Sequence, residues 1–152
     1  MTVPNSNSRK VVADKLGQLL AETYTLAFKT HGYHWNLVGP QFHDLHALFG
    51  TQYAALYEAA DTVAERIRAL GQPSPASYDQ FAKLSKVKAD GETAPQMQLV
   101  ERLRDGHAQA VRTAYEVIEV AEQQGDVSTA DLATQRITEH EKAAWMLGSI
   151  LG

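Results

Sequence analysis

The sequence predicts an all-α fold, a four-helix bundle in which one long crossover joins the second helix to the third. Apolar residues recur every three or four positions along four long segments, the spacing that aligns them on one face of an α-helix. Glycine and proline interrupt this pattern at 39–40, across 71–95 and at 125. The first and last connections are therefore short, and the middle one is long.

The first two helices are the best defined. A polar leader, residues 1–9, is expected to be flexible and precedes a single domain that occupies residues 10–152. The second helix opens near Gln41 and closes at Gly71, which gives it a length of about 43 Å for roughly 29 residues. The first helix carries an apolar stripe that ends in two histidines, and the stripe consists of Leu16, Leu20, Tyr24, Ala27, His31 and His34.

The middle connection is too rich in proline and glycine for a long helix, but it accommodates a short one around Tyr78 to Leu84. The third long helix runs from about Pro95 to Gln124. A break at 125–126 leads into the fourth, which continues to Leu151. One long crossover between the second and third helices is the ferritin-like arrangement of a four-helix bundle.

Composition limits the function. A chain of 152 residues that is 44% hydrophobic suits one domain. No apolar run approaches the roughly 20 residues that span a bilayer, and the N-terminus has no apolar signal core, so we expect a soluble, cytoplasmic protein. The absence of cysteine restricts metal ligands to nitrogen and oxygen. The net charge of −4 argues against a surface that coats nucleic acid.

The candidate metal ligands fall into two pairs. His34 can approach His46 across the turn at 39–40, and Asp61 and Glu65 converge because they are four residues apart on one helix. His46 and Asp61, however, are separated by about 22 Å along the second helix. One chain therefore offers an imidazole pair at one end and a carboxylate pair at the other.

A single site made from both pairs would need two chains, with their second helices antiparallel across a two-fold axis. The Glu-x-x-His motif of an intrachain di-iron cage is absent from the sequence. Two imidazoles and two carboxylates suit Fe(II), with zinc or manganese as competitors, because ligand type alone rarely selects a metal.

Structural interpretations of the same residues remain open. Histidines near a helix end can cap carbonyl groups, and Asp61 can form local ion pairs with Arg66 or Arg68 on a solvated face. His107 and His140 each lie singly on an apolar stripe, where a packed, hydrogen-bonded histidine without a chemical role is the expected state.

The stretches HWNLVGPQFHDLHALF and DTVAERIRALG, within Thr30 to Gly71, closely resemble the Dps family of small ferritins. A weaker match, which includes TADL at 129–132 and HEKAAWML at 140–147, extends the resemblance over most of the chain. It implies a hollow homo-dodecamer that oxidises Fe(II), with hydrogen peroxide favoured over dioxygen, and stores ferric mineral as protection against oxidative damage.

The resemblance also assigns residues. It places His34, His46, Asp61 and Glu65 at the metal ligands of the ferroxidase site, shared between two-fold-related chains. It places Trp35 beside that site, where a structural role at an interface is an equally good interpretation. Asp126 and Asp131 resemble residues that line iron-entry pores, although helix capping explains either of them as well.

The sequence departs from the family in two respects. Gly50 stands where many members carry an aspartate that helps to hold a second iron, and His31 or His43 are the nearby residues that could compensate. The DNA binding that gave the family its name is doubtful, because the leader has only Arg9 and Lys10 and the C-terminus has no basic tail. A nucleoid-coating protein with an incidental oxidase centre is the alternative function.

Overall fold

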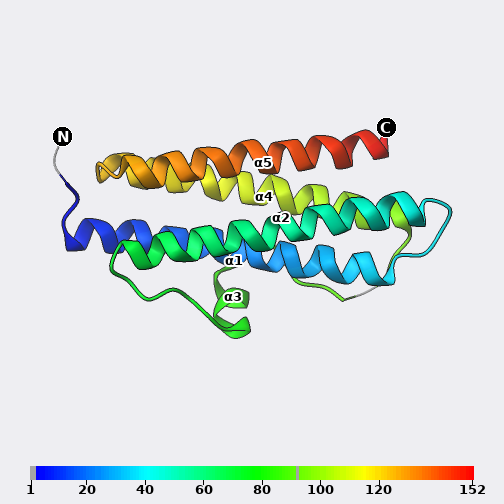
Figure 1. The fold of residues 1–152 in the computed structure, drawn as a ribbon, viewed down its shortest axis with the longest axis horizontal. Coiled ribbons are helices and arrows are strands. Elements are labelled where there is room, and N and C mark those ends of the chain that lie inside the picture. Colours follow the sequence, from blue (N-terminus) through cyan, green and yellow to red (C-terminus); the bar gives the residue numbers. More distant parts are fainter. Residues whose placement is uncertain (1–2, 92) are drawn as a thin grey trace.

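The computed structural model describes residues 3–91 and 93–152, which form a four-helix bundle with a short fifth helix in the crossover (Figure 1). The described residues contain no β-strand. The predicted all-α bundle, with its long crossover and short helix, is therefore confirmed. Its elements are α1 (Ser6–Asn36), α2 (Phe42–Ala69), α3 (Tyr78–Leu84), α4 (Gln96–Gln123) and α5 (Val127–Leu151).

The direction of the helices explains the long crossover. Helices α1 and α5 run one way along the bundle, and α2 and α4 run the other way (Figure 1). Because α2 and α4 are parallel, the chain has to return along the length of the bundle between them. The returning segment carries α3, which packs against α1.

Helix α1 begins at Ser6, within the segment 1–9 that was expected to be a flexible leader. The side chain of Asn5 explains the early start, because its Oδ1 accepts a hydrogen bond from the Ser8 backbone N–H at 2.9 Å. The Arg9 side chain also donates to the Pro4 carbonyl. Residues 6–9 of the expected leader are thus helical, and its first two residues lie outside the described part of the chain.

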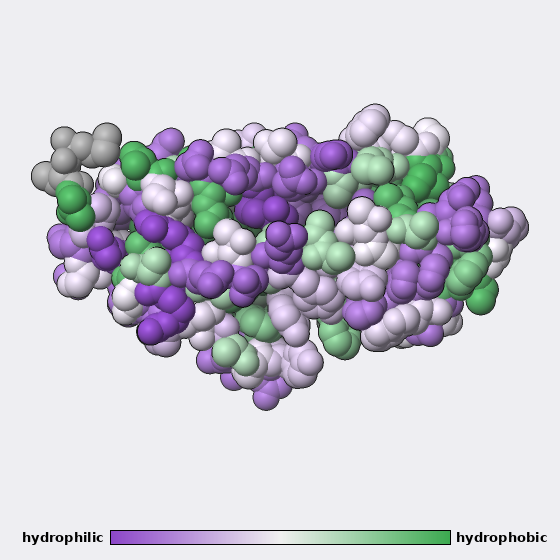
Figure 2. Space-filling model, in the orientation of Figure 1, coloured by the Kyte–Doolittle hydropathy of each residue, from purple (hydrophilic) through white to green (hydrophobic). Residues whose placement is uncertain are grey.

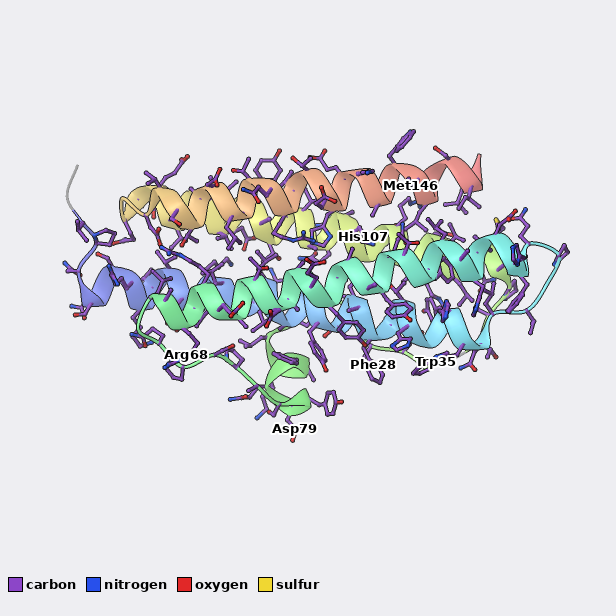
Figure 3. The ribbon with its side chains drawn as sticks, viewed as in Figure 1. Phe28, Trp35, Arg68, Asp79, His107 and Met146 are labelled. Atoms are coloured by element: carbon purple, nitrogen blue, oxygen red, sulfur yellow. The ribbon has the colours of Figure 1, made fainter. Side chains whose placement is uncertain are left out.

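The core consists of two hydrophobic clusters, one toward each end of the bundle. Leu16, Val63 and Val117 belong to the cluster near the start of α1, and Phe49 and Leu103 belong to the cluster near the α1–α2 connection. Buried polar side chains lie outside both clusters, and they include the predicted packed histidines, of which one is labelled in Figure 3. The middle of the bundle is therefore partly polar.

Hydrophobic side chains also reach the surface. On the face shown in Figure 2, one group of them lies at the end that holds the α1–α2 connection and the last turns of α5. Trp35, Val38 and Trp145 are the most exposed large side chains of this region, at 59%, 77% and 68%. None of the helices in residues 3–91 and 93–152 has both the length and the apolar character of a membrane span.

Candidate metal centre

His34, near the end of α1, and His46, near the start of α2, lie face to face. Their ring centroids are 3.7 Å apart, and the ring planes differ by 12°. Each ring is anchored to the backbone of the other residue: His34 Nδ1 lies 2.7 Å from the His46 carbonyl oxygen, and His46 Nδ1 lies 2.8 Å from the His34 carbonyl oxygen. The predicted approach of the two histidines is confirmed.

These two hydrogen bonds determine which nitrogen of each ring carries a proton. A carbonyl oxygen can only accept, so both Nδ1 atoms must carry the donated hydrogen. In the neutral rings the Nε2 atoms then keep their lone pairs, and neutral imidazole is the form that ligates a metal. A backbone carbonyl that holds the Nδ1–H is also the usual outer partner of a metal-bound histidine.

The turn between the helices makes this pairing possible. Gly39 has a φ of 135°, a conformation open to glycine, and a Cβ there would lie only 2.7 Å from the Gln96 side chain. Its carbonyl accepts from the backbone N–H of Phe42 at 3.1 Å, which starts α2. The Phe42 ring then stacks on His46, with centroids 4.9 Å apart.

Aromatic rings also pack around His31, next to the stacked pair of His34 and His46. His31 stacks on Tyr53 with centroids 3.9 Å apart and contacts Trp35 at 4.1 Å. Desolvation by this packing, followed by the neighbouring His34, lowers the pKa of His31. The ring of His31 is therefore embedded among aromatic rings, of which Trp35 is labelled in Figure 3 near the end of α1.

Gly50 leaves no carboxylate next to the imidazoles. A Cβ at this position would lie 3.2 Å from Cε1 of His34, so any larger residue would press on that ring. Of the two histidines that could compensate, His31 has its ring centroid 6.2 Å from that of His34, and His43 is exposed on the outer side of α2.

Asp61 and Glu65 lie one turn apart on α2, and both are exposed. The interpretation that Asp61 pairs with Arg66 or Arg68 is wrong. Arg66 instead binds the Asp126 carboxylate at 2.9 Å, and Arg68 donates to a backbone carbonyl. Within residues 3–91 and 93–152, neither Asp61 nor Glu65 has a cation within 4 Å, so both carboxylates remain open to a ligand from outside the chain.

The two pairs do not meet within one chain. Helix α2 is continuous from Phe42 to Ala69, which keeps His46 and Asp61 about 22 Å apart along the axis. Among the described residues, no group of three or more histidine, aspartate or glutamate side chains is placed to hold a metal ion. A complete four-ligand site would need a second chain.

Asp126 caps α5, as one of the two interpretations predicts. Its carboxylate accepts from the backbone N–H and the hydroxyl of Thr129, at 3.0 and 2.6 Å, and binds Arg66. At 4% exposure it is a buried structural group in the single chain rather than an open pore residue. Asp131 is exposed, and its assignment to a pore stays a prediction.

His107 and His140 are packed and hydrogen-bonded, as predicted. Both are almost fully buried, and their Nδ1 atoms are 2.9 Å apart. Burial lowers the pKa of His107 to about 3 and holds the pKa of His140 well below its ordinary value.

Comparisons with known proteins agree with this fold. Residues 13–152 match the family model of the ferritin-like domain. The chain is 34% identical to "DNA protection during starvation protein 2" of Bacillus anthracis, over 93% of this chain and 97% of that protein. It is 37% identical to an uncharacterised low temperature-induced protein of a Nostoc species, over 94% and 81%.

A solved structure shows the same fold. The crystal structure of the Dps protein from Vibrio cholerae superposes with a TM-score of 0.94 at 30% identity, covering 98% of this chain and 94% of that one. That protein is described as a member of the superfamily of ferritin-like diiron-carboxylate proteins. The fold and the family match thus define a ferritin-like protein, and within that class the chain belongs to the Dps family.

Proposed function

We propose that the protein is a mini-ferritin that oxidises Fe(II) in the cytoplasm, at sites shared between two chains, and stores the ferric product inside a hollow homo-dodecamer. The observation that carries the proposal is the reciprocal pair of hydrogen bonds between His34 and His46. These bonds leave two metal-binding nitrogens on one chain, and the carboxylates that would complete the set lie at the far end of the same helix.

The reaction is a redox step with Fe(II) as substrate. Each of two Fe(II) ions gives up one electron, and one hydrogen peroxide takes both electrons and two protons to become two waters. The carboxylates of Asp61 and Glu65 favour Fe(III) over Fe(II) because anionic oxygen binds the harder ion more strongly. Removing peroxide and iron together would protect a cell from the radicals that they generate.

The shared site requires an assembly. In a two-fold dimer with antiparallel α2 helices, His34 and His46 of one chain would face Asp61 and Glu65 of the other, and the symmetry would create the site twice. The exposed hydrophobic side chains near the α1–α2 connection support burial of this end against another chain.

The test uses two variants, each of which lacks one half of the site. One variant, His34→Ala/His46→Ala, lacks the imidazoles, and the other, Asp61→Ala/Glu65→Ala, lacks the carboxylates. Each variant alone should lose rapid peroxide-dependent iron oxidation, followed by the absorbance of the ferric product. When the two variants are dissociated, mixed and reassembled, roughly a quarter of the sites should recover, since half of the randomly formed interfaces are mixed and each has one intact site.

The controls are separate reassembly of each variant, which must stay inactive, and reassembly of the wild type, which must regain activity. Native mass spectrometry verifies that the two chains have mixed. If verified mixed oligomers show no recovery, the shared site is refuted, and a different ligand set must be sought.

A further inference from the structure

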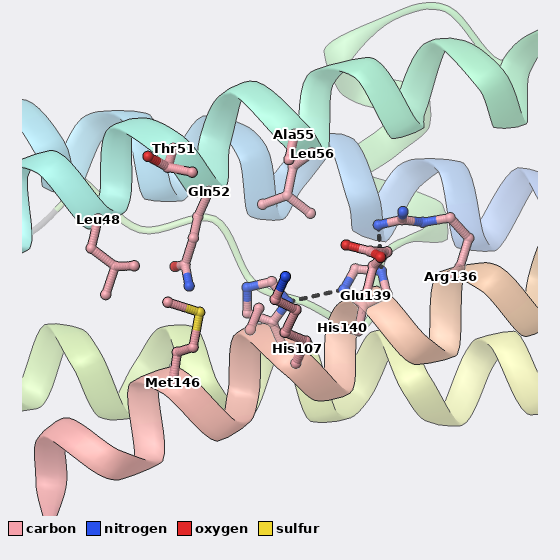
Figure 4. Close-up of a pocket in the computed structure, with 12 residues that line it drawn as sticks. Leu48, Thr51, Gln52, Ala55, Leu56, His107, Arg136, Glu139, His140 and Met146 are labelled. Carbon is pink, nitrogen blue, oxygen red and sulfur yellow. Dashed lines mark hydrogen bonds between the residues drawn. The ribbon is translucent and has the colours of Figure 1, made fainter.

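The side of α2 that faces α5 and the side that faces α1 carry different residues. Toward α5, α2 lines a cavity together with His107 and His140, and no described tyrosine or tryptophan lines that cavity (Figure 4). Toward α1, Tyr53 and Tyr57 of α2 pack against aromatic rings of α1. The tyrosines of α2 thus lie on the side that also holds the candidate metal centre.

Tyr53 and Tyr57 lie on the same face of α2 as the proposed iron ligands. Tyr53 follows His46 by seven residues, and Tyr57 and Asp61 follow at two further steps of four residues. Steps of four and seven residues bring side chains to one face of an α-helix. The two tyrosines therefore occupy the part of α2 between the imidazole pair and the carboxylate pair.

The rings form a continuous series of contacts. The centroid of the Tyr53 ring lies 5.2 Å from that of His34 and 6.0 Å from that of Tyr57, and both contacts are edge-on. Tyr57 in turn lines a pocket together with Asp61. The series therefore begins at a proposed ligand near one end of α2 and ends beside a proposed ligand near the other.

Tyr57 also has a neighbour that can take its proton. Its hydroxyl oxygen lies 3.4 Å from His31 Nδ1, and the His31 ring stacks on Tyr53. Removal of one electron makes a phenol strongly acidic, so a tyrosine is oxidised readily only where a base accepts the proton. In the neutral tautomer with a bare Nδ1, His31 is such a base.

The proposed reaction needs a path for electrons. Hydrogen peroxide takes two electrons, but Gly50 supplies no carboxylate that could hold a second Fe(II) beside the first. In a two-fold dimer, the second electron has to come from the other site of the same interface, about 22 Å away along α2. Electron transfer through protein slows steeply with distance, so intermediate rings that divide this span into short steps would speed it.

We propose that Tyr53 and Tyr57 relay one electron between the two iron sites of a dimer, an inference that rests on the proposed function. At the first site, Fe(II) and a tyrosine each give one electron to hydrogen peroxide. The O–O bond breaks, two protons from solvent complete two waters, and the phenolic proton passes to His31, which leaves Fe(III) and a neutral tyrosyl radical. Fe(II) at the second site then reduces the radical, and the proton returns from His31. No hydroxyl radical is released.

Freeze-quench electron paramagnetic resonance of the whole assembled protein tests the relay. The protein is loaded with Fe(II) without oxygen and then mixed with hydrogen peroxide. At one Fe(II) for every two sites, many interfaces hold a single iron, so a tyrosyl radical should accumulate. At one Fe(II) per site the radical should be weaker, because the second Fe(II) reduces it.

Variants identify the tyrosines. Tyr53→Phe/Tyr57→Phe keeps both rings but removes both hydroxyl groups, so it should lose most of the radical signal at the lower loading. It should also release more hydroxyl radical to a spin trap than the wild type does. Tyr115→Phe changes an exposed tyrosine of α4 that lies outside the series, and it should behave like the wild type.

The absorbance of the ferric product, recorded in parallel, distinguishes failure of the relay from failure of the proposed function. If the wild type oxidises no Fe(II) rapidly, both are refuted. If it oxidises Fe(II) rapidly but forms no tyrosyl radical at the lower loading, or forms a tryptophan radical instead, the relay alone is overturned. A radical that persists unchanged in Tyr53→Phe/Tyr57→Phe has the same meaning. Should that variant fail to assemble, equal radical signals from the wild type at both loadings would overturn the relay.

Discussion

Trp35 lies one residue beyond His34, and its ring contacts that of His31 at 4.1 Å. Because its neighbour is a proposed iron ligand, its emission can report on metal at that site. Trp145, on α5, is 68% exposed, and in the described part of the chain it has no ring contact with the histidines that surround Trp35. It should contribute a constant background to such a measurement.

Fe(II) added without oxygen should therefore quench tryptophan emission, with a break near one Fe(II) per site, because Gly50 supplies no carboxylate for a second ion. His46→Ala should remove most of this quenching, and His43→Ala, which changes an exposed histidine, should not. The measurement is an anaerobic fluorescence titration. If His46→Ala quenches like the wild type, the metal is bound elsewhere.

His107 and His140 make the folded state sensitive to acid. Burial lowers the pKa of both below the value of about 6.5 in an unfolded chain, so the stability they contribute is complete above pH 6.5. It is lost as the pH falls, because the unfolded state then binds protons that the folded state cannot. With a folded pKa of about 3 for His107, that residue alone should remove about 2 kcal/mol of stability between pH 7 and pH 5.

The check is denaturant unfolding at both pH values and at one fixed chain concentration, since assembly also affects stability. His107→Gln/His140→Gln should lose less stability between pH 7 and pH 5 than the wild type does. His43→Gln removes an exposed histidine and should behave like the wild type. Equal losses for all three proteins would mean that the buried pair does not titrate as described.

At the scale of the helices, Asp126 joins two elements. Its carboxylate caps the first turn of α5 and also binds Arg66 of α2. Asp126→Ala should lower the free energy of unfolding by about 2 kcal/mol, since it removes a cap and leaves the arginine without its partner. Asp131→Ala, an exposed change on the same helix, should cost about 0.5 kcal/mol or less, and chemical denaturation of both variants compares the two.

The sequence predicts these helices well where glycine and proline mark their ends. Gly39 and Gly71 have positive φ and lie just beyond α1 and α2, so the predicted breaks are close to the observed ones. The segment expected to be a leader includes the first residues of α1, because a polar segment after Asn5 resembles a coil in sequence, and only the structure shows its capping hydrogen bond.

The candidate site was predictable for a similar reason. His34 and His46 come together because a short turn joins their helices, and a short turn can be predicted from the sequence. The contact between His107 and His140 was not predictable, because the two residues lie on different helices and are 33 positions apart in sequence. Apolar spacing indicates which face of a helix is buried, but not which residues of another helix it meets.

For the whole molecule, the net charge is the basis of a prediction about DNA binding. Relatives carry names that refer to DNA protection, but this chain has a net charge of −4, and twelve copies would carry about −48. The two basic residues near the N-terminus are also occupied within the chain: Arg9 donates to Pro4, and Lys10 pairs with Asp14 at 2.9 Å. The described residues offer no basic arm for phosphate groups.

The protein should therefore not retard duplex DNA in a mobility-shift assay at neutral pH and near physiological salt, because like charges repel. A variant with a lysine-rich extension ahead of residue 1 is the positive control. Retardation by the unmodified protein at stoichiometric concentration would contradict this prediction and favour the nucleoid-coating alternative.

The parallel course of α2 and α4 has a consequence for how the chain folds. Helices α1 and α2 form one antiparallel hairpin and α4 and α5 form another (Figure 1), and most contacts between helices lie within these hairpins. Contacts between residues close in sequence form fastest, so each hairpin can assemble before the crossover is in place. The crossover then acts as a tether, which holds two preformed halves at high effective concentration until their apolar faces meet.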